Sequence, residues 1–472
     1  MLEILGDMDE EEISANDLMD LIRRFESDSE QEHYEYYAQH LFAALIEHYL
    51  DNARYDEALK AVDVAIEQHP YHAPFFARKA FIHTMDEETS EALESIDKAL
   101  EFEPGNPEFL TQKGSIFELM GKPMEALDLF DEALEHDASE QDVLILKMFV
   151  YFNLGNHAMS LRMIEDLFSK EIEEDRVIME AHFCLQLMEA YDDGVRILEA
   201  YTNIDPYNEA VWYHLGQLNA VSENYTRAIE CFDFAAAIDD TYAEPIMEKG
   251  QCQMQLDLFN EAIQSFQEYI EMEGADALAY TQIGDCYRLM DQYKRSRLNY
   301  QLALKTDPKV AGAWLGLGQS FCAEGRYADA LTYLQKANKL YPNDEYTMVE
   351  LARTLAELGR SEEAEDTLKN VTDFCPTYDE AWLELARIYH ELGETYDAIQ
   401  LLEGALDRVK DKSRVHYRLA AYYLLNGVAR NGYEHLTDAL LINFDDHPML
   451  FEDAPFLQNV QAVNDIIDLY RK

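Results

Sequence analysis

The sequence predicts an all-α protein, a solenoid built from helix-turn-helix repeats. Residues 39–446 divide into twelve consecutive segments of 34 residues without an inserted or deleted residue. A long fixed period of this kind is typical of stacked repeats, in which each unit packs on its neighbours. The segments begin at residues 39, 73, 107, 141, 175, 209, 243, 277, 311, 345, 379 and 413.

Three positions within the segments support this register when each segment is numbered in columns 1–34. Column 20 holds Ala, Ser or Gly in all twelve segments, and column 8 is Ala or Gly in nine. Small residues at these positions allow two helices to approach closely. Column 32 is proline in six segments, and proline cannot continue a helix. The columns therefore predict the helix crossings and the segment ends.

Each segment is expected to form two amphipathic helices. In the segment that begins at residue 209, the first helix carries Trp212 and Leu215 on one face, and the second carries Ala228 and Phe232. Spacings of three and four residues place apolar side chains on one side of a helix. The two apolar faces can then pack together.

The ends of the chain are expected to cover the terminal repeats. Residues 1–38 form an acidic segment whose first dozen residues are predicted to be disordered. Ser14 and Asp17 have the spacing of a capping box at the start of a short capping helix.

Residues 447–472 break the period and are predicted to form the C-terminal cap. Pro448 and Pro455 interrupt the repeat, and residues 456–471 are expected to form one amphipathic capping helix. Docking of that helix on a second copy of the chain is the alternative.

Composition narrows the classes of function. The chain has 37 basic and 94 acidic residues and a net charge of −57, which disfavours nucleic acid and anionic membranes as partners. No apolar run is long enough to span a bilayer, and the N-terminus lacks a secretory signal pattern, so a cytoplasmic location is expected. Six cysteines are spread singly through the repeats, which fits neither a zinc site nor a disulfide framework.

Sequence motifs of enzymes are absent. We find no zinc-protease, nucleophile-elbow, dinucleotide-binding or phosphate-loop motif. We therefore predict no catalytic residue, no cofactor and no metal. A hydrolase with a carboxylate or metal site in its groove is the less favoured alternative.

The repeat columns resemble those of the tetratricopeptide repeat family. Its usual Trp, Leu-Gly, Tyr, Ala, Phe, Ala and Pro positions are almost complete in segments 209–242 and 311–344, and the resemblance covers 408 of 472 residues. The resemblance implies a right-handed superhelix whose columns 2, 5, 9 and 12 line a concave groove. It also implies a non-catalytic scaffold or adaptor that binds a peptide or protein there. No segment has the Lys and Asn pair with which some family members clamp C-terminal carboxylates. A self-assembling structural subunit is a further alternative, and the oligomeric state stays open.

Segments 141–174 and 175–208 depart most from the pattern and suggest an apolar peptide site. Apolar residues on both faces of a first helix leave one face to be covered by a partner or by tighter packing of the irregular repeats. The candidate apolar groove consists of Ile145, Phe149, Phe152, Met179 and Phe183.

A cationic stretch in the later repeats suggests an anion site. Arg353 and Arg387 occupy the same column of adjacent segments, which places them about 8–10 Å apart. Glu350 and Glu384 stand three residues before them, so ordinary pairs on each helix are the alternative. The candidate anion patch consists of Arg288, Arg353, Arg387, Arg414 and Arg418.

Overall fold

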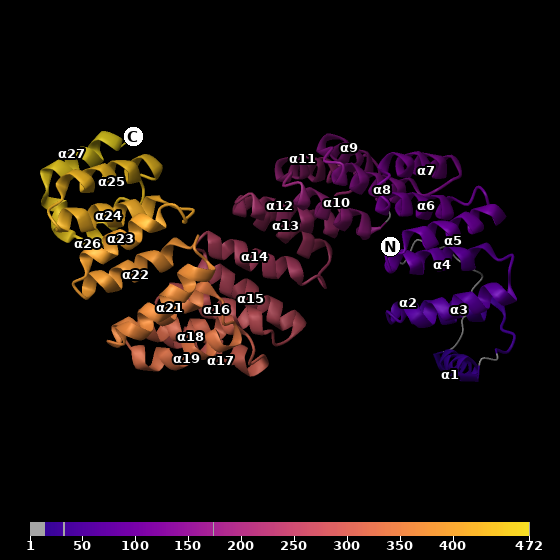
Figure 1. Ribbon diagram of the computed structural model, residues 1–472, viewed down its shortest axis with the longest axis horizontal. Coiled ribbons are helices and arrows are strands. Elements are labelled where there is room, and N and C mark those ends of the chain that lie inside the picture. Colours follow the sequence, from indigo (N-terminus) through magenta and orange to yellow (C-terminus); the bar gives the residue numbers. More distant parts are fainter. Residues whose placement is uncertain (1–14, 32–33, 173, 472) are drawn as a thin grey trace. The chain divides into compact units, whose positions relative to one another are not determined.

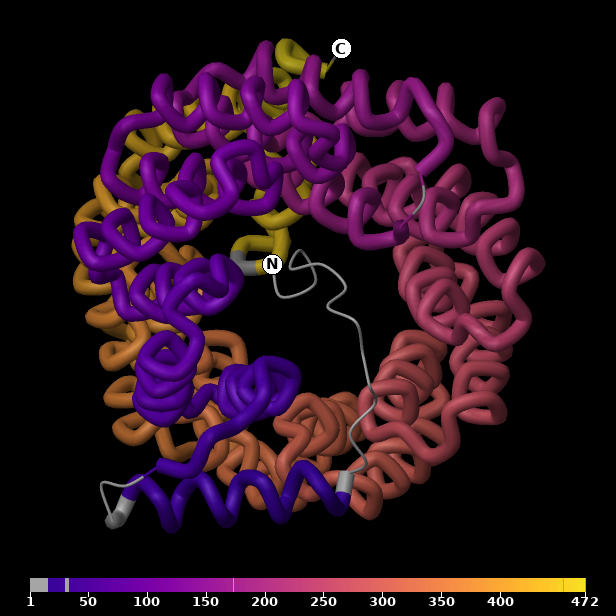
Figure 2. Tube along the Cα trace, turned by 90° about the vertical axis from the view of Figure 1, so that its right-hand side faces the viewer, coloured from indigo at the N-terminus to yellow at the C-terminus, as the bar shows by residue number. Residues whose placement is uncertain are grey.

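The computed structural model describes residues 15–31, 34–172 and 174–471, and no strand occurs within these ranges. Its contacts divide the chain into two compact units, Met1–Asp239 and Asp240–Lys472 (Figure 1). In both units consecutive helices run back and forth and pack as pairs (Figure 2). The predicted all-α solenoid of helix-turn-helix repeats is therefore confirmed. Within the described residues, no helix is both long enough and apolar enough to cross a membrane.

Unit 1 contains a first helix, α1 (Ala15–Gln31), followed by six helix pairs. The pairs are α2 (Gln39–Asp51) and α3 (Tyr55–Gln68), α4 (Ala73–Met85) and α5 (Thr89–Phe102), α6 (Pro107–Leu119) and α7 (Pro123–Glu135), α8 (Glu140–Asn153) and α9 (His157–Leu167), α10 (Asp175–Leu187) and α11 (Tyr191–Tyr201), and α12 (Glu209–Val221) and α13 (Tyr225–Ile238).

Unit 2 contains six further pairs and the C-terminal elements. The pairs are α14 (Glu244–Gln255) and α15 (Phe259–Glu273), α16 (Ala277–Leu289) and α17 (Tyr293–Thr306), α18 (Ala311–Cys322) and α19 (Tyr327–Leu340), α20 (Glu345–Glu357) and α21 (Ser361–Phe374), α22 (Asp379–Glu391) and α23 (Thr395–Ala405), and α24 (Ser413–Leu425) and α25 (Ala429–Ile442). They are followed by α26 (Met449–Asp453), the 3₁₀ helix η1 (Pro455–Asn459) and α27 (Gln461–Tyr470).

The glycines of column 8 are required by close packing within a pair. A Cβ atom added to Gly250 would lie 2.6 Å from the Phe266 ring of the next helix, and one added to Gly216 would lie 2.5 Å from the Phe232 ring. Such distances are shorter than van der Waals contact, so a larger side chain would force the helices apart. The small first-helix residue and the large second-helix residue therefore form one packing unit.

Every pair is closed by the same left-handed turn at column 15. The N–H of column 16 donates to the carbonyl of column 11, as from Arg54 to Tyr49 and from Val428 to Tyr423. This bond and the positive φ together form a Schellman motif, which satisfies carbonyls at a helix end. The column 15 residues, all with φ between 53° and 86°, are Ala53, Glu87, Gly121, Gly155, Glu189, Glu223, Asp257, Asp291, Gly325, Gly359, Gly393 and Gly427.

A second recurring bond ties neighbouring segments together. The indole N–H of Trp212 donates to the carbonyl of Pro206 over 2.9 Å. Trp314 and Trp382 make the equivalent bonds, at 3.0 Å, to the proline six residues earlier. Each bond joins column 4 of one segment to column 32 of the segment before it.

The first helix covers the start of the first pair. Leu21, Ile22 and Phe25 of α1 are buried and share one hydrophobic core with Phe42 and Leu45 of α2. The predicted capping residue Ser14 and the segment predicted to be disordered lie outside the described residues.

The C-terminal elements differ from the single helix predicted for residues 456–471. Pro455 begins η1, and α27 begins only at Gln461, because Val460 between them has an extended backbone (φ −91°, ψ 108°) that interrupts the helix. Phe456 is consequently 49 % exposed, whereas Val463 and Ile467 of α27 are buried in the core of the last repeat.

The left-handed turns give a prediction about stability. Gly155 has open space around its Cα, so Gly155→Ala should destabilise unit 1 by about 1–2 kcal/mol through backbone strain alone. Glu223→Gly, in the same column, should stabilise the unit by up to about 1 kcal/mol. Urea denaturation followed by circular dichroism measures both changes. Equal stability of wild type and Gly155→Ala would contradict this account of the turn.

Candidate functional site

An exposed apolar stripe runs along α10 in unit 1. Met179, Phe183 and Leu187 are 54 %, 50 % and 46 % exposed. Their spacing of four residues places them on one face of the helix. We call these three residues the α10 stripe. Large side chains that remain half-exposed in a row are typical of a docking surface.

The opposite face of α10 is anchored in the core. Val177, Ile178, Ala181 and Leu185 are fully or almost fully buried, and they share a core with residues of α8 and α12. The helix also contacts α8 and α12 directly. The α10 stripe therefore stands on a fixed support between two neighbouring first helices.

The sequence-predicted groove residues of α8 have different surroundings. Ile145 is only 6 % exposed and belongs to the core of these repeats. Phe149 and Phe152 are partly buried and pack against the same core. The irregular repeat thus buries Ile145 itself, as the alternative interpretation expected, and leaves Met179 and Phe183 accessible.

Leu187 is the residue of this surface that sequence reasoning missed. It lies at column 13, outside the columns that the family resemblance assigns to the groove. The available signal was its position four residues after Phe183, which extends the apolar stripe by one helical turn.

Two histidines lie at the contact of α10 with α12. The rings of His182 and His214 have centroids 4.5 Å apart. Burial, with a further contribution from His214, lowers the pKa of His182 to about 3. His182 is therefore neutral at neutral pH, which suits its place within an apolar contact.

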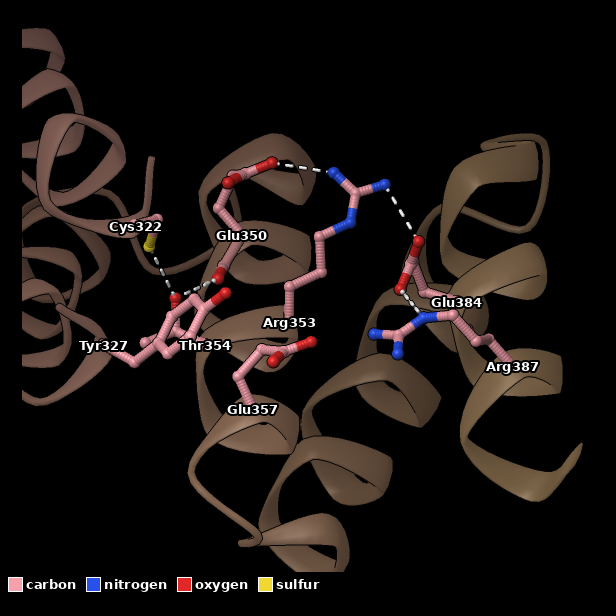
Figure 3. Close-up of a pocket in the computed structure, with 8 residues that line it drawn as sticks. All are labelled: Cys322, Tyr327, Glu350, Arg353, Thr354, Glu357, Glu384 and Arg387. Atoms are coloured by element: carbon pink, nitrogen blue, oxygen red, sulfur yellow. Dashed lines mark hydrogen bonds and ion pairs between the residues drawn. The ribbon is translucent and has the colours of Figure 1, made fainter. Parts of the chain in front are cut away.

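The predicted arginine patch forms an ion-pair network in unit 2. Arg353 pairs with Glu350 of its own helix at 2.7 Å and with Glu384 of α22 at 3.0 Å. The same Glu384 accepts a hydrogen bond of 2.9 Å from Arg387 and lies between the two guanidinium groups (Figure 3). Arg387 also pairs with Glu391 at 2.6 Å.

The network extends to α24 through Arg414. Its guanidinium pairs with Asp379 at 2.7 Å and also contacts Glu380, and Glu380 contacts Arg353 in turn. We call Arg353, Arg387, Arg414 and their carboxylate partners the arginine cluster. Its carboxylates are Glu350, Asp379, Glu380, Glu384 and Glu391.

The other two predicted arginines differ from these three in position or in exposure. Arg288 pairs with Asp285 of its own helix α16 at 3.4 Å, two repeats before Arg353. Arg418 is only 7 % exposed. The structure brings together Arg353, Arg387 and Arg414, and an external anion would compete there with the chain's own carboxylates. Anion binding at this place stays a prediction.

Electrostatics favour a charged Glu384. Burial alone would raise the pKa of this carboxyl, but the guanidinium groups of Arg353 and Arg387 outweigh burial, and its pKa is lowered. An ionised Glu384 therefore stabilises the contact between α20 and α22.

The arginine cluster borders a small polar cavity of about 310 Å³. Cys322 lines it and lies 3.2 Å from the hydroxyl of Thr354. Burial raises the pKa of the Cys322 thiol, so the nucleophilic thiolate is disfavoured at neutral pH. The lining residues carry both positive and negative charges, and Cys322 among them is not an activated nucleophile.

Comparison with known proteins finds a repeat family in unit 2. Models of the tetratricopeptide repeat match residues 321–374, 290–345 and 349–413. The curated proteins include no match. Among solved structures, the MamA protein is 19 % identical with a TM-score of 0.31, and the match covers 35 % of this chain and 90 % of that chain. Yeast Tom70 is 15 % identical with a TM-score of 0.44, and the match covers 81 % of this chain and 95 % of that chain.

The lowered pKa of Glu384 gives a prediction about acid stability. Because the folded-state pKa lies below the unfolded one, the ionised carboxylate stabilises unit 2 above about pH 4.3. Glu384→Gln should therefore cost roughly 1–3 kcal/mol at neutral pH. The difference between the two proteins should shrink as the pH falls through the folded-state pKa. Urea denaturation at a series of pH values measures it, and a difference that does not vary with pH would contradict the assignment.

Proposed function

We propose that this chain, which belongs to the tetratricopeptide repeat family, is a non-catalytic scaffold that binds an amphipathic peptide segment of a partner protein on the α10 stripe. The single observation that carries the proposal is the row of three half-exposed apolar side chains on a helix whose other face is buried. Burying such side chains against apolar residues of a partner is the main source of affinity in helix-in-groove recognition.

The charge of the chain favours a basic partner. The net charge is −57, and an acidic surface speeds the encounter with a cationic segment. Near the α10 stripe, the positive charge of Arg176 is already balanced by ion pairs with Asp142, over a short contact, and with Glu174, at 3.5 Å. We therefore expect apolar anchor residues flanked by Lys or Arg. The same charge argues against nucleic acids and anionic membrane surfaces as ligands.

The chemistry around the stripe supports binding rather than catalysis. His182 is neutral because burial lowers its pKa. Cys184 is buried, and burial raises the pKa of its thiol. The thiolate of Cys184, which is the form that reacts as a nucleophile, is therefore disfavoured at neutral pH. A scaffold needs only a rigid surface, which the anchored α10 provides.

Substitutions on the stripe test the proposal. Peptides can be selected from a random library against the wild-type chain, and their affinities measured by fluorescence anisotropy. Met179→Ser/Phe183→Ser should weaken the selected peptides by about 30-fold or more, as expected for loss of hot-spot side chains. The peptides should be rich in apolar and basic residues. Binding as tight to the double variant as to wild type would overturn the proposal.

Three controls define the result. Leu298→Ser removes an apolar side chain of α17 that is 61 % exposed and should leave peptide affinity unchanged. Thermal melting of Met179→Ser/Phe183→Ser should match that of wild type, because neither side chain belongs to the core. Light scattering over a range of concentrations checks for self-association. A wild-type dimer that dissociates in the double variant would make a second copy the occupant and would also overturn the proposal.

A further inference from the structure

The last repeat brings three metal-ligating side chains together. The Nδ1 atoms of His416 and His435 lie 2.9 Å apart. One ligand atom from each histidine and a carboxylate oxygen of Asp438 all lie within 4.8 Å of one another. Both histidines are partly buried, and Asp438 is exposed. Within the described residues, this is the one such group of three or more His, Cys, Asp or Glu side chains.

The repeat geometry explains why these residues meet. They occupy columns 4, 23 and 26 of the segment that begins at residue 413. In the segment that begins at residue 311, the same columns hold Trp314, Tyr333 and Lys336. There the Tyr333 ring stacks 6.1 Å from the Trp314 ring, and the Lys336 ammonium lies 4.3 Å above the indole. The fold thus brings these three columns together in the segment at residue 311 as well, where their side chains are not metal ligands. In the last repeat all three carry side chains that bind metals.

We propose that His416, His435 and Asp438 form a site for a divalent transition-metal ion, for which Zn²⁺ is the best fit. Imidazole nitrogen and carboxylate oxygen are ligands that Zn²⁺ takes together. With Zn–N bonds of about 2.0–2.1 Å, two nitrogens on one ion lie about 2.9 Å apart at a right angle and about 3.4 Å apart at the tetrahedral angle. The observed separation falls at the edge of this range.

Charged groups of both signs surround the two histidines. Burial lowers the pKa of both rings, the carboxylates Asp438, Glu403 and Glu434 oppose this effect at His435, and Lys412 adds to it at His416. The ring of Tyr423 stacks on His435 at 5.5 Å and 7°, and its hydroxyl donates to Glu403. The stacked ring restrains the orientation of the His435 imidazole. This restraint lowers the ordering cost of binding a metal.

The ligand arrangement also suggests what the ion would do. His416 lies on α24, and His435 and Asp438 lie on α25. One ion would therefore join the two helices of the last repeat across their contact. Three protein ligands leave a position for water. A bound ion would stabilise the folded repeat, because the unfolded chain does not hold the ligands together.

Metal titration of the full chain tests this site. The chelator-treated protein is titrated with Zn²⁺ by calorimetry in excess Mg²⁺, which occupies carboxylate-only sites. Co²⁺ titration followed by visible absorption reports nitrogen ligands at the ion. We expect one Zn²⁺ per chain, d–d absorption of bound Co²⁺, and a higher melting temperature with Zn²⁺.

Three variants assign the ligands. His416→Phe and His435→Phe retain an aromatic ring, as columns 4 and 23 carry in the segment at residue 311, and should abolish the stoichiometric Zn²⁺ binding. Asp438→Asn changes an exposed side chain and should weaken Zn²⁺ by about 10-fold or more. His136→Gln alters an exposed histidine of unit 1 and should change nothing. The proposal is overturned if wild type binds no Zn²⁺ under these conditions, or if its Zn²⁺ affinity and Co²⁺ spectrum persist in all three variants.

Discussion

The left-handed turn at column 15 is the constraint on which both units depend. It ends the first helix of every pair and sets the start of the second, with one bond from column 16 to column 11 repeated in each segment. A helix whose last carbonyls are satisfied can stop abruptly. Because all twelve pairs stop at the same column, the glycines at column 8 of the first helices meet large residues of the second helices. Packing at Gly250 and Phe266 depends on this register.

The sequence predicted the repeat but only part of its physical basis. Columns 8 and 20 could be recognised because close packing favours small residues there. Column 32 could be recognised because proline ends a helix. Column 15 could not, since glycine fills only half of it and Ala53, Glu87 and Glu223 adopt the same positive φ. At these positions the closing hydrogen bond and the packing of the helix pair outweigh the preference of non-glycine residues for a negative φ. A uniform backbone feature can thus be hidden by mixed residue types.

A candidate surface could be predicted from the sequence where the residues that form it lie close together in the chain. Met179 and Phe183 lie on one helix, so spacing alone suggested a shared face. The burial of Ile145 depends on core residues from several helices and could not be read from α8. For Arg353, sequence showed the local partner Glu350, but Glu384 lies 31 positions further along the chain. Only the stacking of consecutive repeats brings that carboxylate between two arginines.

The bonds from the tryptophans to prolines have a spectroscopic consequence. The chain has three tryptophans, all at column 4, and each indole N–H is held by the preceding segment. An indole that leaves this bond for water changes its fluorescence, so each tryptophan reports whether its own segment junction is intact. Trp212 lies in unit 1, and Trp314 and Trp382 lie in unit 2. In variants that keep only one of the three tryptophans, intrinsic emission can therefore distinguish the opening of one junction from that of another without an added label.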